Sequence, residues 1–362
     1  VSGDFRQHAV ANFIEPVLTH LRQNPQFSIY AYSNNSCEDE VTRRIRSSVH
    51  NWRLIDGRSD EFVAQLVRED SIDILIDLSG HTAHNRLLVF VRKPAPVQAS
   101  WIGYAGTTGL ASMDYYFGDP YWLPVGKFEN QFSEKIIRLP ATGLFQPFSE
   151  APDVNPLPAY KNGFLTFGSF NLLRKLTPSV IAVWSQIMRA APSSRMLLGA
   201  MPEAGDNVTL IDQFARHGIE RGRLSFHQKM PTTDYLRLHH QVDVCLDTFP
   251  YPGGTTSCHA LWMGVPTVTR VGDTPVSRVG ALLQNHAGLT QFIANGEDEF
   301  VARAAYWVSN FDELALIRNT LRTRFAESAM GQPELVGTAF QKALRTMWHR
   351  WCDGDPPVAF DV

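Results

Sequence analysis

The 362-residue chain has few cysteines and no marked excess of either charge, and these absences exclude several classes of protein. Its four cysteines lack both the C-x-x-C spacing of a zinc site and the density of a disulfide framework; they are Cys37, Cys245, Cys258 and Cys352. The 33 basic and 36 acidic residues give a formal net charge of −3, which argues against a general nucleic-acid binder. We therefore expect no metal site, no nucleic-acid partner and a cytoplasmic location.

Long apolar runs and the common nucleotide-binding motifs are also missing. No apolar run reaches the roughly 18 residues that span a bilayer, and no signal peptide is visible, so we expect no membrane partner. Neither G-x-G-x-x-G nor G-x-x-x-x-G-K-[ST] occurs, which argues against a dinucleotide-binding enzyme and a phosphate-loop ATPase. A G-x-S-x-G elbow is absent as well, so the chain does not look like a hydrolase.

The length and the strand and helix patterns predict two α/β domains. A chain of this length with 44% hydrophobic residues fills two ordinary cores. In the first half, helical patterns alternate with expected strands at 27–32, 52–55, 72–78 and 97–102. The proline-rich segment 151–158 is typical of a linker, and a second alternating series begins with a strand at 163–170. We therefore expect mostly parallel sheets and domains at 1–155 and 156–362.

A long amphipathic pattern closes the chain. Apolar residues recur at helical spacing from Val336 to Trp351. We expect a final helix here that crosses back to the first domain.

One stretch of the second half has the features of an anion site. The strand expected at 242–247 is followed by a turn rich in Pro and Gly, and then by a helix that opens with Thr255 and Thr256. The unpaired amides and positive dipole end of such a helix favour phosphate, and Gly254 allows close approach of a ligand. His259 shares a helix face with Thr255. A glycine-rich turn with a threonine cap is the alternative interpretation.

Other polar residues are expected at the carboxyl ends of strands, where parallel sheets bind ligands. Lys175 follows the strand at 163–170 and offers an ammonium group to a phosphate, although a solvated surface lysine is the alternative. In the first half, three loops that follow strands carry His8, His81 and Gly103. For each histidine, a structural or surface role competes with a catalytic one. Lys175 and the helix start at Thr255 would form a diphosphate clamp on the second domain, and the polar loops of the first domain would face the sugar and the acceptor. This arrangement suits a nucleotide-sugar transferase.

Five segments, in order along the chain, resemble the catalytic region of the O-linked N-acetylglucosamine transferases, glycosyltransferase family 41. They are Val1–His8, Pro94–Thr107, Phe170–Lys175, Asp243–Thr256 and Leu261–Pro266. The resemblance implies a GT-B fold, in which two Rossmann-like domains face a cleft. It also implies inverting transfer of N-acetylglucosamine from UDP-N-acetylglucosamine to Ser or Thr of a protein or peptide, with no metal and no other cofactor.

The resemblance further assigns roles to individual residues. Lys175, Thr255 and Thr256 match positions that hold the diphosphate, and the backbone near Met230 matches a contact to uracil. Gly103 would lie by the sugar. His8 matches a functional histidine near the sugar and the leaving group, either as a base or as a positioning group.

The chain departs from the animal members of the family at several donor contacts. Tyr235 stands where those enzymes place a His against uracil, and its ring can still stack. Their ribose-binding Asp aligns with His259, a Gln aligns with Leu172, and a His before the paired threonines aligns with Gly254. His81 stands where they have Tyr, and we include it with His8 and Lys175 among the catalytic candidates. The expected donor contacts therefore also include Asn171, Tyr235, Gly254 and His259.

Two alternatives to this function follow from those departures. One is a related transferase that uses another UDP-sugar, such as UDP-glucose, or an Asn acceptor. The other is a UDP-sugar-binding scaffold without catalysis. The short linker suggests a bacterial-type enzyme. Because Val1–Phe5 looks like the end of a strand, we also expect upstream sequence, including the tetratricopeptide repeats usual in the family.

Overall fold

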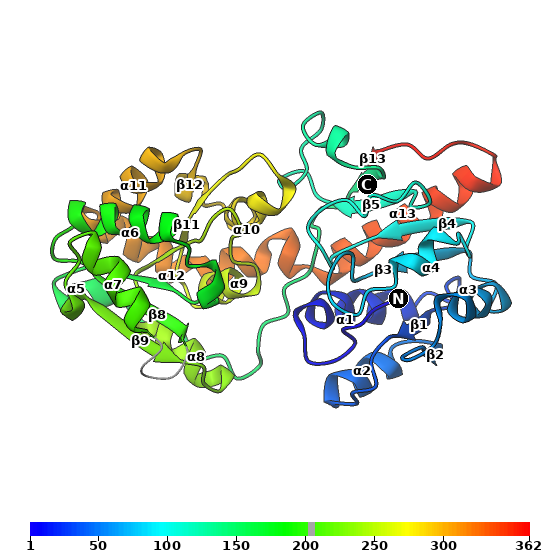
Figure 1. The fold of residues 1–362 in the computed structure, drawn as a ribbon, viewed down its shortest axis with the longest axis horizontal. Helices are drawn as coiled ribbons and strands as arrows, with labels where there is room; N and C mark the ends of the chain where they lie inside the picture. The colour runs from blue at the N-terminus through cyan, green and yellow to red at the C-terminus, as the bar shows by residue number, and fades with distance from the viewer. Residues whose placement is uncertain (202–206) are drawn as a thin grey trace. The chain divides into compact units, whose positions relative to one another are not determined.

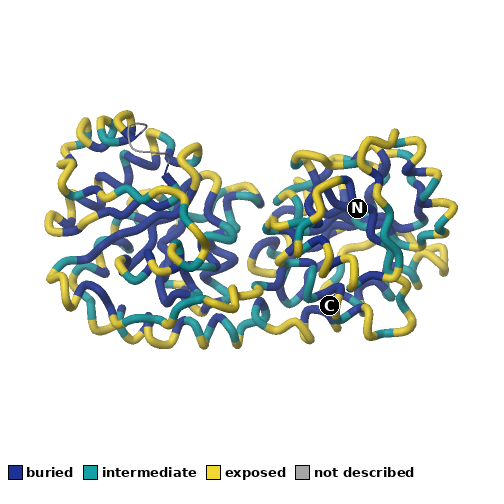
Figure 2. Tube along the Cα trace, turned by 90° about the horizontal axis from the view of Figure 1, so that it is seen from below, coloured by how far each residue is buried: buried dark blue, intermediate teal, exposed yellow. Residues whose placement is uncertain are grey.

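The computed structural model describes residues 1–201 and 207–362 and divides into two compact units. Unit 1 comprises Val1–Gln146 and Ala329–Val362, and unit 2 comprises Pro147–Ser328 (Figure 1). Every strand pairing in both units is parallel, which agrees with the expected α/β class. In both units the trace is mostly buried along the strands and exposed on the outer turns of the helices (Figure 2).

These units differ from the expected domains 1–155 and 156–362 at both ends. The proline-rich segment belongs to unit 2, because the carbonyl oxygens of Pro152 and Asn155 accept hydrogen bonds from Arg322 and Arg318. Residues 329–362 belong to unit 1, where the last long helix, α13 (Pro333–Cys352), packs against helix α1 (Ala9–Arg22). This is the return to the first domain that the amphipathic pattern predicts.

Unit 2 contains a six-stranded sheet with the strand order of a dinucleotide-binding fold. Its order is β12-β11-β10-β7-β8-β9, which is 6-5-4-1-2-3 when the strands are counted along the chain. The bounds are β7 Thr166–Ser169, β8 Arg195–Met201, β9 Leu224–Gln228, β10 Val244–Leu246, β11 Thr267–Arg270 and β12 Ile293–Ala294. The order reverses between β7 and β10, and ligands bind beyond the carboxyl ends of strands at such a switch point.

Helices cover both faces of this sheet. Right-handed crossovers that leave the centre in opposite directions place their helices on opposite faces. Accordingly, α6 packs with α7 and α11, whereas α9 packs with α10 and α12. The helices of unit 2 are α5 Pro158–Asn162, α6 Pro178–Ala190, α7 Val208–Arg216, α8 Thr232–Leu238, α9 Thr255–Trp262, α10 Val279–His286, α11 Glu297–Tyr306 and α12 Phe311–Glu327.

Unit 1 repeats the same strand order once its first two residues are counted. Strands β1 (Tyr30–Ser33) and β2 (Asn51–Leu54) pair with each other, and a separate sheet has the order β13-β6-β5-β4-β3. Val1 and Ser2 lie between β1 and β3: the Val1 amino group donates to the Ile76 carbonyl at 2.8 Å, and the Ser2 amide donates to the Tyr32 carbonyl at 3.1 Å. The combined order is β2-β1-(Val1, Ser2)-β3-β4-β5-β6-β13.

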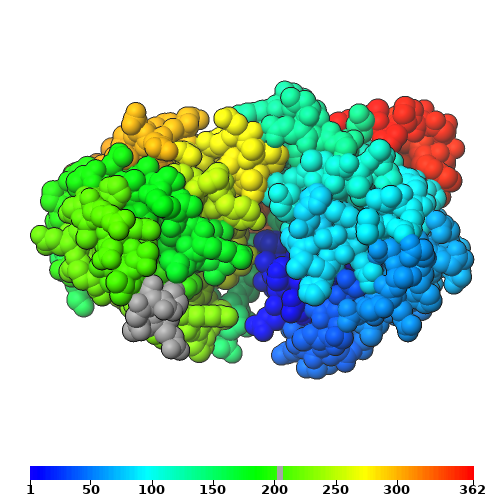
Figure 3. Space-filling view, in the orientation of Figure 1, coloured from blue at the N-terminus to red at the C-terminus, as the bar shows by residue number. Residues whose placement is uncertain are grey.

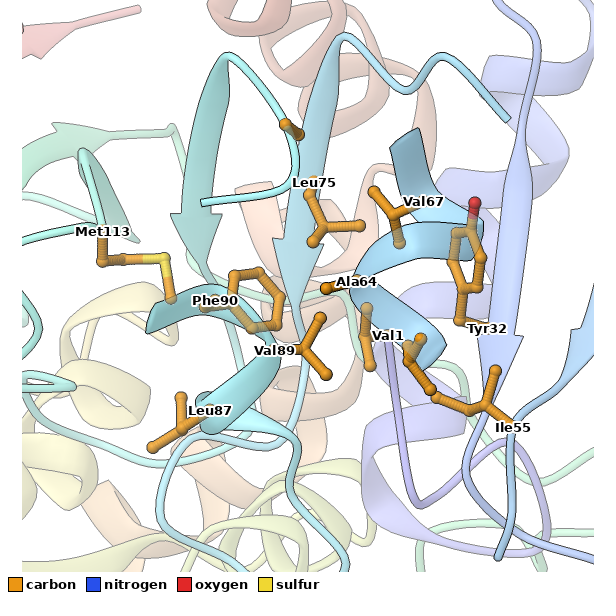
Figure 4. Packing of buried hydrophobic residues seen from close by; sticks show 12 residues of the cluster. Val1, Tyr32, Ile55, Ala64, Val67, Leu75, Leu87, Val89, Phe90 and Met113 are labelled. Carbon is orange, nitrogen blue, oxygen red and sulfur yellow. The ribbon is translucent and has the colours of Figure 1, made fainter. Parts of the chain in front are cut away.

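The remaining elements of unit 1 surround this combined sheet. The strands are β3 Ile74–Asp77, β4 Val97–Ser100, β5 Tyr115–Gly118, β6 Lys135–Arg138 and β13 Phe360–Asp361, and the other helices are α2 Glu40–Ser47, α3 Asp60–Glu69 and α4 Leu87–Val91. One buried cluster joins strand residues such as Tyr32 and Leu75 to Ala64 and Val67 of α3 and to Phe90 of α4 (Figure 4). Among the described residues, no helix combines the length and the apolar content needed to cross a membrane.

A buried arginine ties α12 to the sheet of unit 2. Arg318 is fully buried and donates to the carbonyl oxygens of Val242 and Asn155, each at 2.8 Å, and of His239 at 3.1 Å. Burial lowers the pKa of this guanidinium to about 10, partly offset by the carboxylate of Asp243, so Arg318 remains charged at neutral pH.

Replacing Arg318 should therefore destabilise unit 2 strongly. We expect Arg318→Leu to lower the free energy of unfolding by about 3–5 kcal/mol, because three buried carbonyl oxygens lose their donor and the nearby Asp243 carboxylate loses a favourable positive charge. Urea denaturation followed by circular dichroism measures this loss. Arg216→Leu, at an exposed position of α7, is the matched control and should change stability by less than about 0.5 kcal/mol. Equal effects of the two substitutions would contradict the assignment.

Candidate functional site

The predicted anion-binding residues of unit 2 meet at the switch point between β7 and β10. Asn171 and Lys175 follow β7, and Lys175 ends the 3-10 helix Leu173–Lys175. Thr255 and Thr256 open α9 after the loop that leaves β10. The two segments are in contact, because the Thr256 Oγ1 hydroxyl donates to Asn171 Oδ1 at 3.4 Å. Residues 85 positions apart in the sequence thus lie together.

The start of α9 has the geometry expected for an anion site. Gly254 is its N-cap residue and supplies no side-chain cap, while its carbonyl accepts from the amides of Ser257 and Cys258 at 3.0 Å each. The amides of Thr255 and Thr256 stand at the first two helical positions, where a helix provides no internal acceptor. A Cβ on Gly253 would lie 2.4 Å from the Ser257 hydroxyl oxygen and 2.9 Å from that of Thr256, so a side chain here would displace the hydroxyls of the first turn of α9.

Lys175 is directed at this loop and is only partly exposed. Its Nζ atom donates to the carbonyl oxygen of Pro252 at 2.8 Å and lies 4.6 Å from the centroid of the Tyr251 ring. Desolvation by burial lowers the pKa of this ammonium, whereas the nearby charge of Asp247 raises it. An ammonium has three donors, of which the Pro252 carbonyl uses one. This placement favours the phosphate-binding interpretation of Lys175 over the solvated one.

A buried carboxylate, which we did not single out as a site residue from the sequence, underlies this loop. Asp247 follows β10 and accepts hydrogen bonds from the amides of Thr248 at 2.9 Å and Gly253 at 2.7 Å, and from the Thr269 hydroxyl at 2.8 Å. Asp247 is 1% exposed, and burial raises the pKa of its carboxyl group. The sequence signal was present, since an Asp ends the apolar run just before the Pro- and Gly-rich turn.

The residues expected at the nucleobase and the ribose form an aromatic cluster beside the anion site. The Tyr235 hydroxyl and His259 Nδ1 are 3.2 Å apart, and the Tyr235 ring meets the rings of Phe170 and His239 edge to face. Met230 packs against the same cluster and is partly buried. Burial lowers the pKa of His259 to about 4, so its ring is neutral at pH 7. Stacking of Tyr235 on a base stays a prediction.

In unit 1, His8 caps the first helix and reaches the surface. Its Nδ1 accepts from the Val10 amide at 3.3 Å and lies 3.6 Å from the Asp4 carboxylate. The side chain is 43% exposed, and part of the N-terminal stretch of the chain, dark blue in Figure 3, is visible at the surface of unit 1. Because Nδ1 accepts a hydrogen bond, the neutral ring carries its proton on Nε2, which makes that nitrogen a donor.

The two other predicted loops of unit 1 lie against each other. A Cβ on Gly103 would lie 2.4 Å from the Leu78 carbonyl oxygen, so this glycine allows the loop after β4 to approach the loop after β3. His81 is exposed, and its ring meets Tyr104 edge to face at 5.4 Å. The loop that carries His81 starts from buried Asp77, whose carboxylate accepts from the Gly80 amide at 2.8 Å.

A groove of about 460 Å³ in unit 1 is distinct from these residues. It lies between β1 and β3 and is walled by apolar side chains of α1 and α13, such as Leu18, Phe340 and Trp348. None of the predicted site residues lines it. Within the described part of the chain, no group of three His, Cys, Asp or Glu side chains is placed to hold a metal ion.

Two units with Rossmann strand order define a GT-B-type protein, and the start of α9, the predicted anion site, lies at the switch point of one of them. The chain belongs to glycosyl transferase family 41, whose model matches residues 1–147 and 158–334. The resemblance seen in the sequence is thereby confirmed.

Curated relatives extend well beyond this chain. The chain is 39% identical to a Hordeum vulgare protein named probable UDP-N-acetylglucosamine–peptide N-acetylglucosaminyltransferase SPINDLY. The alignment covers 99% of this chain and 39% of that protein. The chain is 28% identical to the similarly named SEC protein of Arabidopsis thaliana, over 100% of the chain and 38% of that protein. The chain therefore spans about two fifths of the length of these relatives.

Solved structures agree with the fold. A variant of the Thermobaculum terrenum O-GlcNAc transferase matches with a TM-score of 0.91 and 34% identity, over 98% of this chain and 67% of that one. The Anabaena protein HepE, solved with UDP and glucose, matches with a TM-score of 0.58 and 12% identity, over 95% of this chain and 98% of that one. At that identity, the second match supports the fold alone.

Acid should destabilise unit 2 through the histidines beside the site. Burial lowers the pKa of His239 to about 3 and that of His259 to about 4, against about 6.5 in an unfolded chain. Below pH 6.5 the unfolded state therefore binds protons that the folded state does not, so stability is full above that pH and declines as the pH falls toward 4. For each histidine the loss reaches about 2 kcal/mol at pH 5.

His239→Phe should reduce this acid sensitivity, because Phe keeps the stack on Phe170 but binds no proton. Urea denaturation at pH 7.5 and pH 5 should show a decline about 2 kcal/mol smaller than in the wild type. His217→Gln, at the partly exposed end of α7, should keep the wild-type decline. An unchanged pH dependence in His239→Phe would show that His239 is not held neutral.

Proposed function

We propose that this chain is the catalytic region of an inverting glycosyltransferase that moves N-acetylglucosamine from UDP-N-acetylglucosamine to Ser or Thr hydroxyls of a protein. The observation that carries this proposal is the convergence of Lys175 and the first amides of α9 on one loop at the switch point of unit 2. The printed names of the relatives support the donor and the peptide acceptor. We also propose that the protein acts in the cytoplasm.

The clamp acts on the leaving group. In a single displacement, the acceptor oxygen forms a bond to the anomeric carbon while the bond from that carbon to the diphosphate breaks. The electron pair leaves with UDP, and the hydroxyl proton passes to a base. The Lys175 ammonium and the amides of Thr255 and Thr256 would stabilise the charge that develops on the diphosphate, so the reaction proceeds without a metal.

The residues of unit 1 would act on the sugar. His8 offers an Nε2–H donor in its neutral form, which suits a hydrogen bond to the donor sugar or the leaving oxygen better than removal of the acceptor proton. Gly103 brings its loop close to the loop of His81, and the exposed ring of His81 is available to a polar ligand. We assign His8 a donor role and leave the base to another group.

The nucleotide would extend from the clamp toward the aromatic cluster. Met230 and Tyr235 flank the position proposed for uracil, and His259 flanks the position proposed for the ribose. A neutral imidazole held by the Tyr235 hydroxyl binds a ribose less strongly than the carboxylate of the animal enzymes, because a charged acceptor makes the stronger hydrogen bond.

The departures from the animal enzymes at several donor contacts, among them Gly254 and His259, also support a second candidate, a family member that uses another UDP-sugar, such as UDP-glucose. A panel of UDP-N-acetylglucosamine, UDP-glucose and a GDP-sugar, with release of the nucleoside diphosphate as the readout, separates the two. Preference for UDP-N-acetylglucosamine supports the first proposal. Preference for another donor in the panel would replace N-acetylglucosamine as the transferred sugar. Tight UDP binding with no turnover of any donor would indicate a UDP-sugar-binding scaffold.

Lys175→Ala should weaken UDP binding by at least about tenfold, or roughly 1.4 kcal/mol, because the diphosphate loses a partly desolvated cation. Isothermal titration calorimetry with UDP measures this without an acceptor. Lys161→Ala, at an exposed position of α5, removes the same charge elsewhere in unit 2 and should bind like the wild type. Equal affinities for all three proteins would reject the clamp.

His8→Ala should lower turnover roughly 100-fold, as expected for the loss of one donor that acts in the transition state. Its affinity for UDP should stay within about twofold, because the proposed clamp belongs to unit 2. Donor turnover with a Ser- and Thr-containing peptide library and calorimetry with UDP give the two numbers. His349→Ala, an exposed histidine of unit 1, is the control. Full activity of His8→Ala would exclude the donor role.

A further inference from the structure

We propose that Asp247 is a positioning residue, whose buried carboxylate holds the phosphate-binding loop 248–254 in place and balances the charge of Lys175 without touching the substrate. This inference rests on the proposed function, because it concerns the same diphosphate clamp. No other residue in the site combines complete burial with contacts to both segments that build the clamp, among those that the structure describes.

The carboxylate binds both ends of the loop. Asp247 Oδ1 accepts from the amide of Thr248, where the loop begins, at 2.9 Å, and from the amide of Gly253, just before the N-cap of α9, at 2.7 Å. These two bonds fix the path of a loop whose Pro252 carbonyl receives the Lys175 ammonium. The position of the lysine therefore depends on the carboxylate through the loop.

The same oxygen also orients the segment after β7. Asn171 Nδ2 approaches Asp247 Oδ1 at 3.5 Å, which turns the Asn171 amide oxygen toward the Thr256 hydroxyl at 3.4 Å. Because the carboxylate can only accept, it leaves Asn171 one favourable amide orientation. Asp247 thus connects Asn171 to the first turn of α9.

Packing leaves no room for the carboxylate to move. Its Oδ2 accepts from the Thr269 hydroxyl at 2.8 Å, and a Cβ on Gly280 of α10 would lie 2.4 Å from Oδ2. On the backbone side, Trp184 Nε1 donates to the Asp247 carbonyl at 3.3 Å. A group that is enclosed on all sides has only one arrangement, and it therefore holds its hydrogen-bond partners in one position.

The charge of Asp247 has a second effect. Among the described residues, the charged groups that act on Lys175 are Asp247, which favours its protonated form, and Arg174, which opposes it. The titratable groups near the Asp247 carboxylate are Lys175 and the thiol of Cys245. The pKa of this thiol is raised by burial and by the charge of Asp247. The groups that face it from β11 and α10 are Thr269 and Gly280, neither of which titrates.

Two substitutions separate the charge from the hydrogen bonds. In Asp247→Asn, the amide oxygen can accept from the loop amides while its NH₂ group donates to the Thr269 oxygen, because a hydroxyl can reverse its role. This variant keeps the loop and loses the charge. Asp247→Ala loses both, and it leaves the buried amides of Thr248 and Gly253 without an acceptor.

The test is calorimetric binding of UDP between pH 7 and 9.5 in the wild type, Asp247→Asn, Asp247→Ala and Lys175→Ala/Asp247→Asn. Without the carboxylate, Lys175 should lose its proton at lower pH. We therefore expect the affinity of Asp247→Asn to fall more steeply than that of the wild type across this range, because the carboxylate raises the pKa of the Lys175 ammonium. The double variant should lack this extra fall. Asp247→Ala should bind at least about tenfold more weakly at every pH.

The possible results are distinguishable. A wild type that binds no UDP overturns the proposed function and this inference together. If the wild type binds UDP and the affinity of Asp247→Asn has the same pH dependence, the charge role alone is overturned. The charge role is also overturned if the extra fall in affinity persists in the double variant. Unchanged affinity in Asp247→Ala overturns the positioning role. Circular dichroism and a thermal melt of each variant confirm that the compared proteins are folded.

Discussion

Buried carboxylates at the carboxyl ends of strands are the interaction on which the polar loops of both units depend. Asp247 follows β10 and accepts two amides of its loop and a hydroxyl of β11. Asp77 ends β3 in unit 1 and accepts the amides of Ser79 and Gly80 and the hydroxyl of Ser100 from β4. The two units therefore share one device, in which a charge that is costly to bury is stabilised by several donors and in return fixes a loop.

A further aspartate shows why this device suits a parallel sheet. Asp119 follows β5 and accepts the amides of Tyr121, Trp122 and Thr142, so it holds two loops of unit 1. Where a parallel strand ends, the chain must turn and its amides lose their ladder partners. An acceptor that is already buried at this point satisfies them without water. The loop above it can then present other amides to a ligand.

Local signals in the sequence accounted for the elements that build the candidate clamp. Thr177 caps α6 with Pro178 in the first turn, as the residue types predict, and its hydroxyl oxygen accepts from the Val180 amide at 3.4 Å. The helix that carries Thr255 also begins where the Gly-Gly pair and the threonines place it. By contrast, β5 and α12 were not singled out. β5 is short and buried on both faces, and Arg318 interrupts the apolar face of α12.

Strand periodicity, helix caps and ordered motifs are local properties of the chain, so they were enough to predict the parallel α/β class, the family and the residue types of the proposed clamp. Which of these residues lie together depends instead on how the strands are ordered in the folded sheet. Asn171 and Thr256 meet because the strand order reverses between β7 and β10, and that reversal has no local signature. The assignment of 329–362 to unit 1 and the role of Asp247 likewise depend on contacts between residues far apart in the sequence, and burial and hydrogen bonding become visible only once the chain is folded.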